Sequence, residues 1–485
     1  MRNFFLFDTF KTHKHHLLLC SLLTLPITGY SANWIPPHDP WLRAELEHQA
    51  SFHQISQPIS TWPLPTSILE SAKQKLSQSA LLSVSQREKN GLRLQLSASG
   101  SQPVLTHFGS TNREKSKSNI SYHFSNNNIS TQISSQYIDN ENSDPTLKFD
   151  NSFMNIDIGH WSVGVGAIDR WWGPGWDTGL ILSSNARPLP SVYLSRNRSD
   201  AFQSKWLSWI GPWTLVTFMG QLEQERVVPN ALLWGMRIAF KPTASWEIGL
   251  SRTAMWAGDG RPKDLSVFID LLAGNDNFEA DDAGKAEEPG NQLAGFDFKY
   301  SNHTPSIGYS FYGEVIGEDE AGGLPSRPIA MLGASLHFTL FQRRATFYTE
   351  FSDTAMDAFQ SDKMYGSAYR HGTYSTGYLY KGVTLGSTYD NDTHAFVMGA
   401  LMNLASNYKF KMTLRQLNLN RDNTTNASNN SVSATKLRTK QVAFALAKNW
   451  RRLSLQASYL WNSDNTESNV NSLRSLAELS AEFQF

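Results

Sequence analysis

The sequence predicts an all-β, closed transmembrane outer-membrane barrel preceded by a small helical region. Three observations support this fold class: an apolar leader at the N-terminus, hydrophobic stripes with a period of two residues over most of the chain, and an amphipathic last segment that ends on Phe485. By length alone, 485 residues would suggest about three soluble domains of roughly 150 residues each. A large barrel uses the same length as a single closed sheet.

Residues 1–31 have the features of a secretory signal peptide. Three basic residues precede an apolar run from Leu17 to Leu25, and small residues follow it. The run is shorter than the roughly 20 residues that a membrane-spanning helix needs, so a membrane anchor is the weaker alternative. Removal of the leader would also remove Cys20, the single cysteine. The mature chain would then have no thiol for a disulfide or a cysteine-bound metal.

The charge balance gives no reason to expect a nucleic-acid partner. The chain has 43 basic and 43 acidic residues, and loss of three bases and one acid with the leader leaves 40 and 42. Such a protein lacks the basic excess that binds phosphate backbones. The mean hydropathy of −0.39 is compatible with a barrel, because barrel strands are apolar only at alternate positions.

Residues 32–90 are predicted to form a periplasmic helical region. Asp39 can cap a helix that has Pro40 in its first turn, where the missing N–H has no cost. Apolar residues then recur at helical spacing. Ser67 and Glu70 form a capping-box pattern ahead of a second helix.

Residues 91–485 are predicted to form the barrel, because the hydrophobic period changes to two residues at this point. In the last segment one face carries Leu479 and Phe485, whereas the opposite face carries Glu478 and Gln484. At about 20 to 24 residues per strand with its share of loop, the length suggests an even number between roughly 16 and 20 strands.

Short and long connections alternate, as they do between the periplasmic turns and outer loops of such barrels. Gly159 and His160 form a short turn. The long polar connections are predicted at Gly258–Gln292, Gly313–Ser326, Asp353–Tyr374 and Asn420–Lys440.

One stretch departs from the strand pattern. Trp171, Trp172 and Trp176 lie within six residues around a Gly-Pro-Gly sequence. Proline removes a ladder donor and both glycines favour turns, so a specifically shaped aromatic loop is expected here.

This stretch resembles the Wzi capsule-assembly family, whose signature is an Arg-Trp-Trp-Gly-Pro-Gly-Trp run followed by Ser-x-Asn-Ala-Arg-Pro-x-Pro. Residues 170–176 and 183–190 match it, and further similar stretches are 41–43, 62–65, 291–297, 316–321, 348–353 and 369–374. The resemblance implies an 18-stranded outer-membrane barrel with loops obstructing its lumen and a periplasmic helical bundle. It also implies a lectin-like anchor that organises capsular polysaccharide on the cell surface.

The candidate site residues are either polysaccharide-binding or lumen-shaping. Tryptophan offers flat faces for sugar C–H groups, and the polar side chains offer hydrogen bonds and charge. The structural alternative places the tryptophans in the interfacial aromatic girdle and the charged residues in lumen ion pairs. Both interpretations stay open for Arg170, Trp171, Trp172, Trp176, Asp177, Asn185, Arg187 and Arg196.

The expected partners are capsular or extracellular polysaccharide and outer-membrane lipid, with the polysaccharide export machinery as a further candidate. The chain is expected to be a monomer with no cofactor and no metal. The acidic run of Asp276, Glu279, Asp281, Asp282, Glu287 and Glu288 lacks the ligand spacing of a calcium loop and is interpreted as solvated.

The sequence disfavours two other functions. An enzyme is disfavoured because the sequence has no nucleophile elbow, zinc-protease helix or phosphate loop, and the carboxylates of Glu350 and Asp353 mean little without geometry. A passive porin would need a continuous polar lumen, which the helical region and the tryptophan-rich loop argue against.

Overall fold

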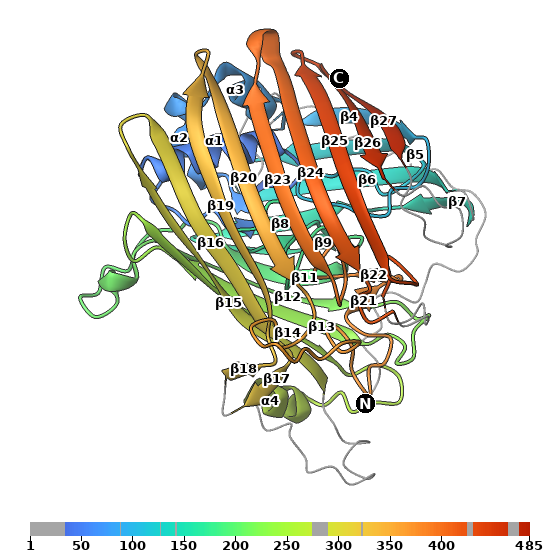
Figure 1. Ribbon diagram of the computed structural model, residues 1–485. Coiled ribbons are helices and arrows are strands. Elements are labelled where there is room, and N and C mark those ends of the chain that lie inside the picture. The colour runs from blue at the N-terminus through green and yellow to red at the C-terminus, as the bar shows by residue number, and fades with distance from the viewer. Residues whose placement is uncertain are drawn as a thin grey trace, which may run out of the picture.

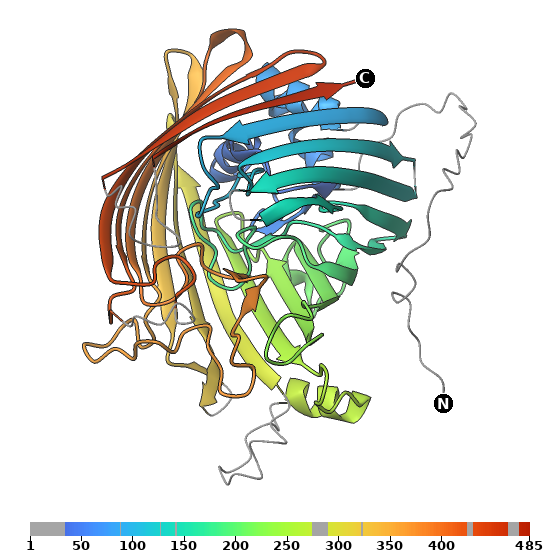
Figure 2. The ribbon, with the colours of Figure 1, turned by 90° about the vertical axis from the view of Figure 1, so that its right-hand side faces the viewer.

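The computed structural model describes residues 34–87, 89–126, 128–140, 143–273, 290–321, 324–423, 430–463 and 475–485. The predicted signal peptide and the acidic run from Asp276 to Glu288 lie outside the described residues. Within them the chain forms a closed antiparallel barrel, in which each strand pairs with its neighbours and the last strand pairs with the first (Figures 1 and 2).

The barrel has 18 strand positions among the described residues, because two short strands, β7 and β8, pair with different parts of β6 and share one position. This confirms the predicted fold class. The strands of the wall are β4 (Gly91–Ser99), β5 (Ser116–Ser125), β6 (Ile129–Asn140), β7 (Ser143–Lys148), β8 (Phe153–Ile158), β9 (Trp161–Ala167), β11 (Pro190–Arg196), β12 (Trp213–Gln221), β13 (Leu232–Phe240), β14 (Trp246–Trp256), β15 (Gly290–His303), β16 (Ile307–Gly317), β19 (Ile329–Leu340), β20 (Arg343–Asp353), β23 (His394–Asn403), β24 (Tyr408–Leu419), β25 (Leu437–Asn449), β26 (Leu453–Asn462) and β27 (Leu476–Gln484).

The two faces of the wall differ as the alternation predicts. Leu96 of β4 and Leu479 of β27 are exposed on the outside, whereas Ser97 and Gln484 point inward and are buried. Among the described strands, closure pairs each wall strand on both sides except the short β7, which pairs with β6 alone. Most ladder groups are thus satisfied by the neighbouring strands, as a hydrocarbon environment demands of a backbone.

Three helices lie before the first wall strand: α1 (Pro40–Ser51), α2 (Ser67–Ala72) and α3 (Gln78–Arg87), with a 3-10 turn η1 (Lys73–Lys75). Asp39 caps α1 as predicted, since its side chain accepts from the N–H groups of Trp41 and Leu42 at 3.1 and 3.0 Å. The predicted capping role of Ser67 is wrong, whereas the side chain of its expected partner Glu70 lies outside the described part of the chain. Thr66 precedes α2 without a side-chain cap, and the Ser67 hydroxyl donates to the Asn197 carbonyl instead.

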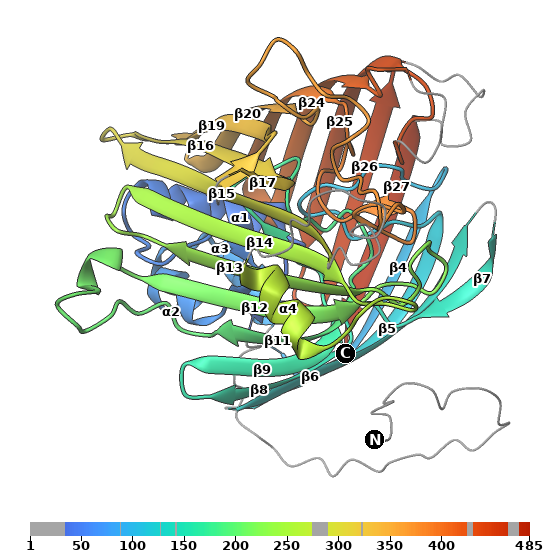
Figure 3. The ribbon, with the colours of Figure 1, turned by 90° about the horizontal axis from the view of Figure 1, so that it is seen from below.

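Helix α1 is buried inside the barrel, where it packs against β15, β16, β19, β20 and β23 (Figure 3). The short strands β1 (Trp34–Ile35), β2 (Thr61–Trp62) and β3 (Leu64–Pro65) flank it in sequence. None of the helices among the described residues is long and apolar enough to cross a membrane.

The barrel has two different ends. At the end that we call the tight-turn end, residues 159–160, 304–306, 341–342, 404–407 and 450–452 join neighbouring strands, and α1–α3 lie in its mouth (Figure 1). The opposite, long-loop end carries the connections 100–115, 168–189, 222–231, 257–289, 318–328, 354–393 and 420–436. Small elements in the connections are η2 (Ser208–Ile210), α4 (Leu265–Ala273), β17 (Asp319–Ala321), β18 (Leu324–Ser326), β21 (Leu379–Tyr380), β22 (Val383–Thr384) and η3 (Ala405–Asn407).

The predicted long connections need three adjustments. Residues 313–317 continue β16, because the ladder with β15 and β19 extends to Gly317 and Ile316. The connection after β20 runs on to residue 393, well beyond Tyr374. The connection after β14 contains the apolar helix α4, whose Phe268 stacks on the Trp256 ring at 4.7 Å.

Replacing an outward residue by lysine tests which face meets lipid. Phe311→Lys, near the middle of β16, should lower the free energy of unfolding by roughly 2–4 kcal/mol, whereas Leu340→Lys, at the end of β19, should cost at most about 1 kcal/mol. Urea unfolding in liposomes, followed by tryptophan fluorescence, measures both. Equal costs at the two positions would contradict a lipid-facing exterior.

Candidate functional site

The tryptophan-rich stretch folds into the lumen. Residues 168–189, which we call the plug, connect β9 to β11, and all of them are buried except Arg187, which is partly exposed. The plug contains β10 (Trp171–Trp172), whose Trp171 pairs with Trp62 of β2 in a two-residue antiparallel ladder. The plug is therefore joined by backbone hydrogen bonds to the segment that follows α1.

The Gly-Pro-Gly turn is needed for this path. Gly173 has a φ of +105°, and a Cβ there would lie 2.9 Å from a carboxylate oxygen of Glu314. A Cβ on Gly175 would lie only 2.1 Å from the Thr178 carbonyl oxygen. Larger residues would disfavour the backbone conformation or displace the wall contact.

One arginine of helix α1 binds the Gly-Pro-Gly turn. The Arg43 guanidinium donates to the carbonyls of Pro174 and Gly175 at 2.5 and 2.8 Å. It also lies over the Trp176 and Phe108 rings, at 4.3 and 4.4 Å from their centroids. Hydrogen bonds and cation–π contacts together stabilise this buried cation.

Two wall carboxylates hold the plug from the opposite side. Glu350 of β20 accepts from the backbone N–H groups of Trp176 and Asp177, at 2.5 and 3.0 Å, and from the Tyr312 hydroxyl at 2.9 Å. Glu314 of β16 accepts from the N–H groups of Leu180 and Ile181, at 2.9 and 3.1 Å. Four backbone donors of an irregular segment are thus satisfied by two inward side chains.

Asp177 is the centre of a buried charge cluster. Arg415 of β24 donates to both of its carboxylate oxygens, at 2.8 to 3.2 Å, and the Tyr389 hydroxyl donates as well. Burial by itself would raise the pKa of Asp177, but the Arg415 guanidinium and the other hydrogen-bond donors hold it well below its usual range. The pairing of Asp177 with Arg415 therefore fixes the plug to the wall.

Two other long loops interlock with the plug. In the 354–393 connection, the Tyr369 hydroxyl donates to the Leu180 carbonyl at 2.6 Å. The Thr388 hydroxyl of the same loop donates to the carbonyl of Thr106 in the 100–115 connection, at 2.7 Å. The Thr106 hydroxyl in turn donates to the Asn185 side chain at 2.9 Å. The three loops form one hydrogen-bonded assembly across the lumen.

The predicted site residues separate into two places. Seven of them lie in the plug, whereas Arg196 lies at the tight-turn end of β11, where its guanidinium is 3.9 Å from the centre of the Trp213 ring. Arg170 donates to the Ser191 hydroxyl at 2.8 Å and lies over Phe218, and Arg187 pairs with Asp150 and Glu114.

The faces of the three motif tryptophans are covered by protein. Trp171 meets the Phe108 ring at 5.4 Å, Trp172 meets Phe218 at 5.7 Å, and Trp176 stacks on Tyr348 at 5.3 Å. All three are at most 2% exposed, and none lies on the outward face of the barrel. This placement favours the lumen-shaping interpretation over both sugar contact and an aromatic girdle.

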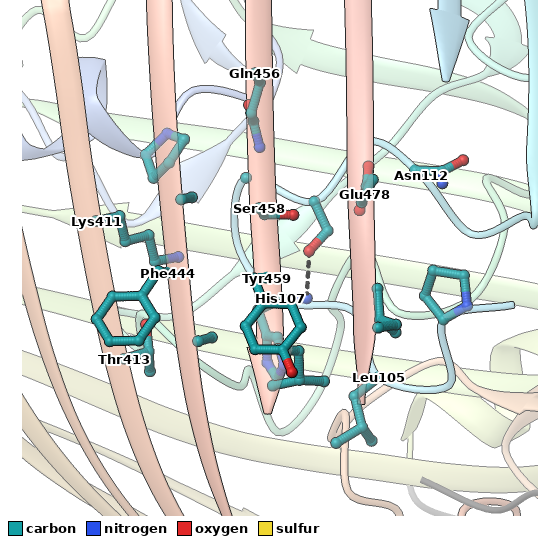
Figure 4. Close-up of a pocket in the computed structure, with 18 of the residues that line it drawn as sticks. Leu105, His107, Asn112, Lys411, Thr413, Phe444, Gln456, Ser458, Tyr459 and Glu478 are labelled. Carbon is teal, nitrogen blue, oxygen red and sulfur yellow. Dashed lines mark hydrogen bonds between the residues drawn. The ribbon is translucent and has the colours of Figure 1, made fainter. Parts of the chain in front are cut away.

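Sequence reasoning missed a cavity of about 160 Å³ beside the plug (Figure 4). It lies between the 100–115 connection and the inner wall, and its polar lining includes Lys411 of β24, Gln456 and Ser458 of β26, and Glu478 of β27. A sequence signal did exist, because β25 presents Ala443, Ala445 and Ala447 inward and so leaves space. Within the part of the chain that the structure describes, no cluster of His, Cys, Asp or Glu could hold a metal ion.

Comparisons with known proteins agree with this architecture. A family model described as capsule assembly protein Wzi matches residues 85–473. The solved structure of Escherichia coli Wzi, an outer membrane protein involved in group 1 capsule assembly and a carbohydrate-binding β-barrel, matches with a TM-score of 0.80 and 26% identity over 94% of this chain and 100% of that chain. An uncharacterized 55.8 kDa protein in the cps region of Klebsiella pneumoniae is 39% identical over 194 residues, which span 40% of this chain and 37% of that relative.

Glu350→Ala is expected to release the plug from the wall. The substitution leaves two buried N–H groups and the Tyr312 hydroxyl without their acceptor. Each unsatisfied group should lower the free energy of unfolding by roughly 1–3 kcal/mol. In planar bilayers the wild-type protein should give almost no steady current, whereas the variant should show open steps. Asp270→Ala, in the exposed part of α4, is the matched control and should stay closed. A silent Glu350→Ala barrel with unchanged thermal stability would contradict the role of this carboxylate.

His107 should make the loop assembly sensitive to acid. Burial, and then the nearby Arg415, lower the pKa of His107 to about 3, below the roughly 6.5 of an unfolded histidine. Between these values the unfolded chain binds a proton that the folded chain does not, so the free energy of unfolding should fall by about 1.4 kcal/mol per pH unit as the pH drops.

His107→Gln removes this contribution, and its urea midpoint should therefore fall less steeply than that of the wild type between pH 6.5 and 4. The substitution also removes the hydrogen bond between His107 Nδ1 and the Asp177 carbonyl, which is 2.9 Å long. Unfolding at pH 7.5, above the pKa of His107 in both states, measures the cost of that loss alone. Parallel curves for the two proteins would contradict a buried neutral histidine.

Proposed function

The chain belongs to the Wzi capsule-assembly family, and from that premise we propose that it binds capsular or extracellular polysaccharide and keeps it organised at the cell surface. It is an outer-membrane β-barrel, as is the E. coli protein that it resembles. Its likeness to that carbohydrate-binding barrel supports polysaccharide as the partner class.

The packing of the plug, two further loops and α1 inside the barrel is the observation that carries this proposal. Three loops are hydrogen-bonded to one another and to Glu314, Glu350 and Arg415 of the wall, and α1 occupies the other mouth. A porin needs an open polar path for its solute, whereas a surface anchor does not. The contacts that fill this lumen therefore favour the anchor over the passive porin.

The orientation follows from loop length. Outer-membrane barrels have short periplasmic turns and long outer loops, so the tight-turn end with α1–α3 faces the periplasm and the long-loop end faces the surface. At the surface, Phe359 and Tyr365 of the 354–393 connection are exposed, and the Arg421 guanidinium lies 5.3 Å from the centre of the Tyr365 ring. Exposed rings beside a cation suit the C–H faces and charges of a polymer.

In this proposal the motif residues position the binding surface. The seven plug residues from Arg170 to Arg187 hold the 354–393 and 100–115 connections in place through contacts such as that of Asn185 with Thr106. Arg196 stabilises the β11–β12 connection at the periplasmic end, where it donates to the carbonyls of Asp200 and Trp213 at 2.9 Å each.

The proposed role is binding without catalysis. Glu350 uses its carboxylate to accept from the plug backbone, and Asp353 forms ion pairs with Lys363 and Arg421 at 2.7 and 2.6 Å. Carboxylates committed to such contacts are poorly placed to act as a general acid and base on a sugar.

The remaining partners follow from the position of the two ends. Outer-membrane lipid surrounds the apolar exterior. The helices α1–α3 lie where polysaccharide export machinery in the periplasm could contact them, and we infer that the barrel acts as a monomer.

Deletion of the gene tests the anchor function. Total polysaccharide should stay constant while a larger share appears in the culture medium, because synthesis does not depend on the anchor. Separate assays of cell-bound and released polymer, with the wild-type gene restored as the control, measure this. Unchanged retention on the cell would contradict the proposal.

A further inference from the structure

Five inward side chains line the cavity of about 160 Å³. Among the described residues, no hydrogen bond or ion pair reaches the polar groups of Lys411, Gln441, Gln456, Ser458 or Glu478. Gln441 is the clearest example of a missing partner, because it is only 1% exposed and both the nitrogen and the oxygen of its side-chain amide are buried without a hydrogen bond. Buried amides are nearly always hydrogen-bonded, so this one calls for an absent ligand or water.

A neighbour on the same strand shows that the lack of partners is local. Lys409 also points inward from β24, two residues before Lys411, and it donates to the Ser83 hydroxyl at 2.7 Å and lies 3.6 Å from Asp39. Residues of the helical region therefore provide partners for the ammonium of Lys409. The described residues provide no hydrogen-bond or ion-pair partner for that of Lys411.

The strand register places these groups in one row. Lys411 is paired with Ala445, Ala445 with Ser458, and Ser458 with Glu478, so the four residues lie side by side across β24 to β27. With strands about 4.8 Å apart, the cation and the carboxylate are separated by roughly 14 Å at their Cα atoms. The small side chains of Ala445 and Ser458 form the floor between them.

The row lies near the surface end of the barrel. Leu460 and Leu476 form the last pair of the β26–β27 ladder, and Ser458 and Glu478 are only two residues further in, about 7 Å along the strands. The 100–115 connection, through Leu105 and His107, forms the other side of the cavity (Figure 4).

The lining has the chemistry of a sugar site. Two amides, a hydroxyl and a carboxylate can exchange hydrogen bonds with the hydroxyls of a pyranose ring. The ammonium of Lys411 can pair with a carboxylate on the ring. The cavity is smaller than the roughly 300–1,000 Å³ of sites that take drug-sized ligands, so it suits a single residue at a chain end or branch.

We propose that Lys411, Gln441, Gln456, Ser458 and Glu478 form a luminal cradle that binds one carboxylated sugar residue of the polysaccharide. This proposal rests on the proposed function and extends it, since it assigns a second contact inside the barrel mouth. The cradle takes a terminal or branching uronate, while the exposed loops contact the rest of the polymer.

Saturation-transfer NMR on the detergent-solubilised full chain tests the cradle with two probes, methyl β-glucuronoside and methyl β-glucoside, which differ in the carboxylate. The glucuronoside should bind saturably and about tenfold more tightly than the glucoside, because only it can pair with Lys411. Lys411→Gln should remove that difference, and Glu478→Gln should weaken both probes.

Ala445→Phe fills the floor of the cavity and should abolish binding of both probes. Leu446→Phe introduces the same ring on the outward face of the same strand and is the matched control. If Ala445→Phe does not fold, Lys411→Gln and Glu478→Gln still decide the question. Wild-type binding that survives in these variants, or no saturable binding of either probe, would overturn the cradle.

A parallel sedimentation assay with polysaccharide from the source organism separates the two proposals. If the wild type and the cradle variants bind the polymer equally, the cradle is wrong and the anchor function stands. If the wild type does not bind the polymer at all, the anchor function itself fails.

Discussion

An irregular chain inside a barrel must have its backbone donors and acceptors satisfied by protein, and this constraint governs the structure. The plug has no regular ladder over most of its length, yet Glu314 and Glu350 accept from four of its N–H groups. An unsatisfied group buried in protein costs roughly 1–3 kcal/mol. The two carboxylates therefore explain how the wall can hold a loop deep within the lumen.

The plug also links the two ends of the barrel. Arg43 joins it to the N-terminal helix, and Trp171 joins it to the segment after that helix through the ladder with Trp62. On the other side, Tyr369 and Thr388 join it to the 354–393 connection at the long-loop end. Because these contacts are buried and mutually dependent, the long loops are held by the same frame that fills the lumen.

The contrast between the plug and the adjacent cavity is informative. Both carboxylate oxygens of Asp177 are engaged by Arg415, and the Tyr389 hydroxyl donates to it as well. A few ångströms away, Gln441 and Lys411 face open space over a floor of alanines. One region of the lumen is built for rigidity, and the other has the unsatisfied groups that a ligand requires.

The sequence by itself determined the strands, the inward and outward faces, and the Asp39 cap, because alternation and capping depend on residues at most a few positions apart. It also marked the stretch from Arg170 to Arg187 as a shaped loop. It did not determine the partners of that loop, since Glu350 lies 174 residues from Trp176 in the chain. Nor did it separate Arg196 from the plug or bring Lys411 and Glu478 into one row. Closure of the sheet alone makes such residues neighbours, and the register of distant strands is a property of the whole barrel.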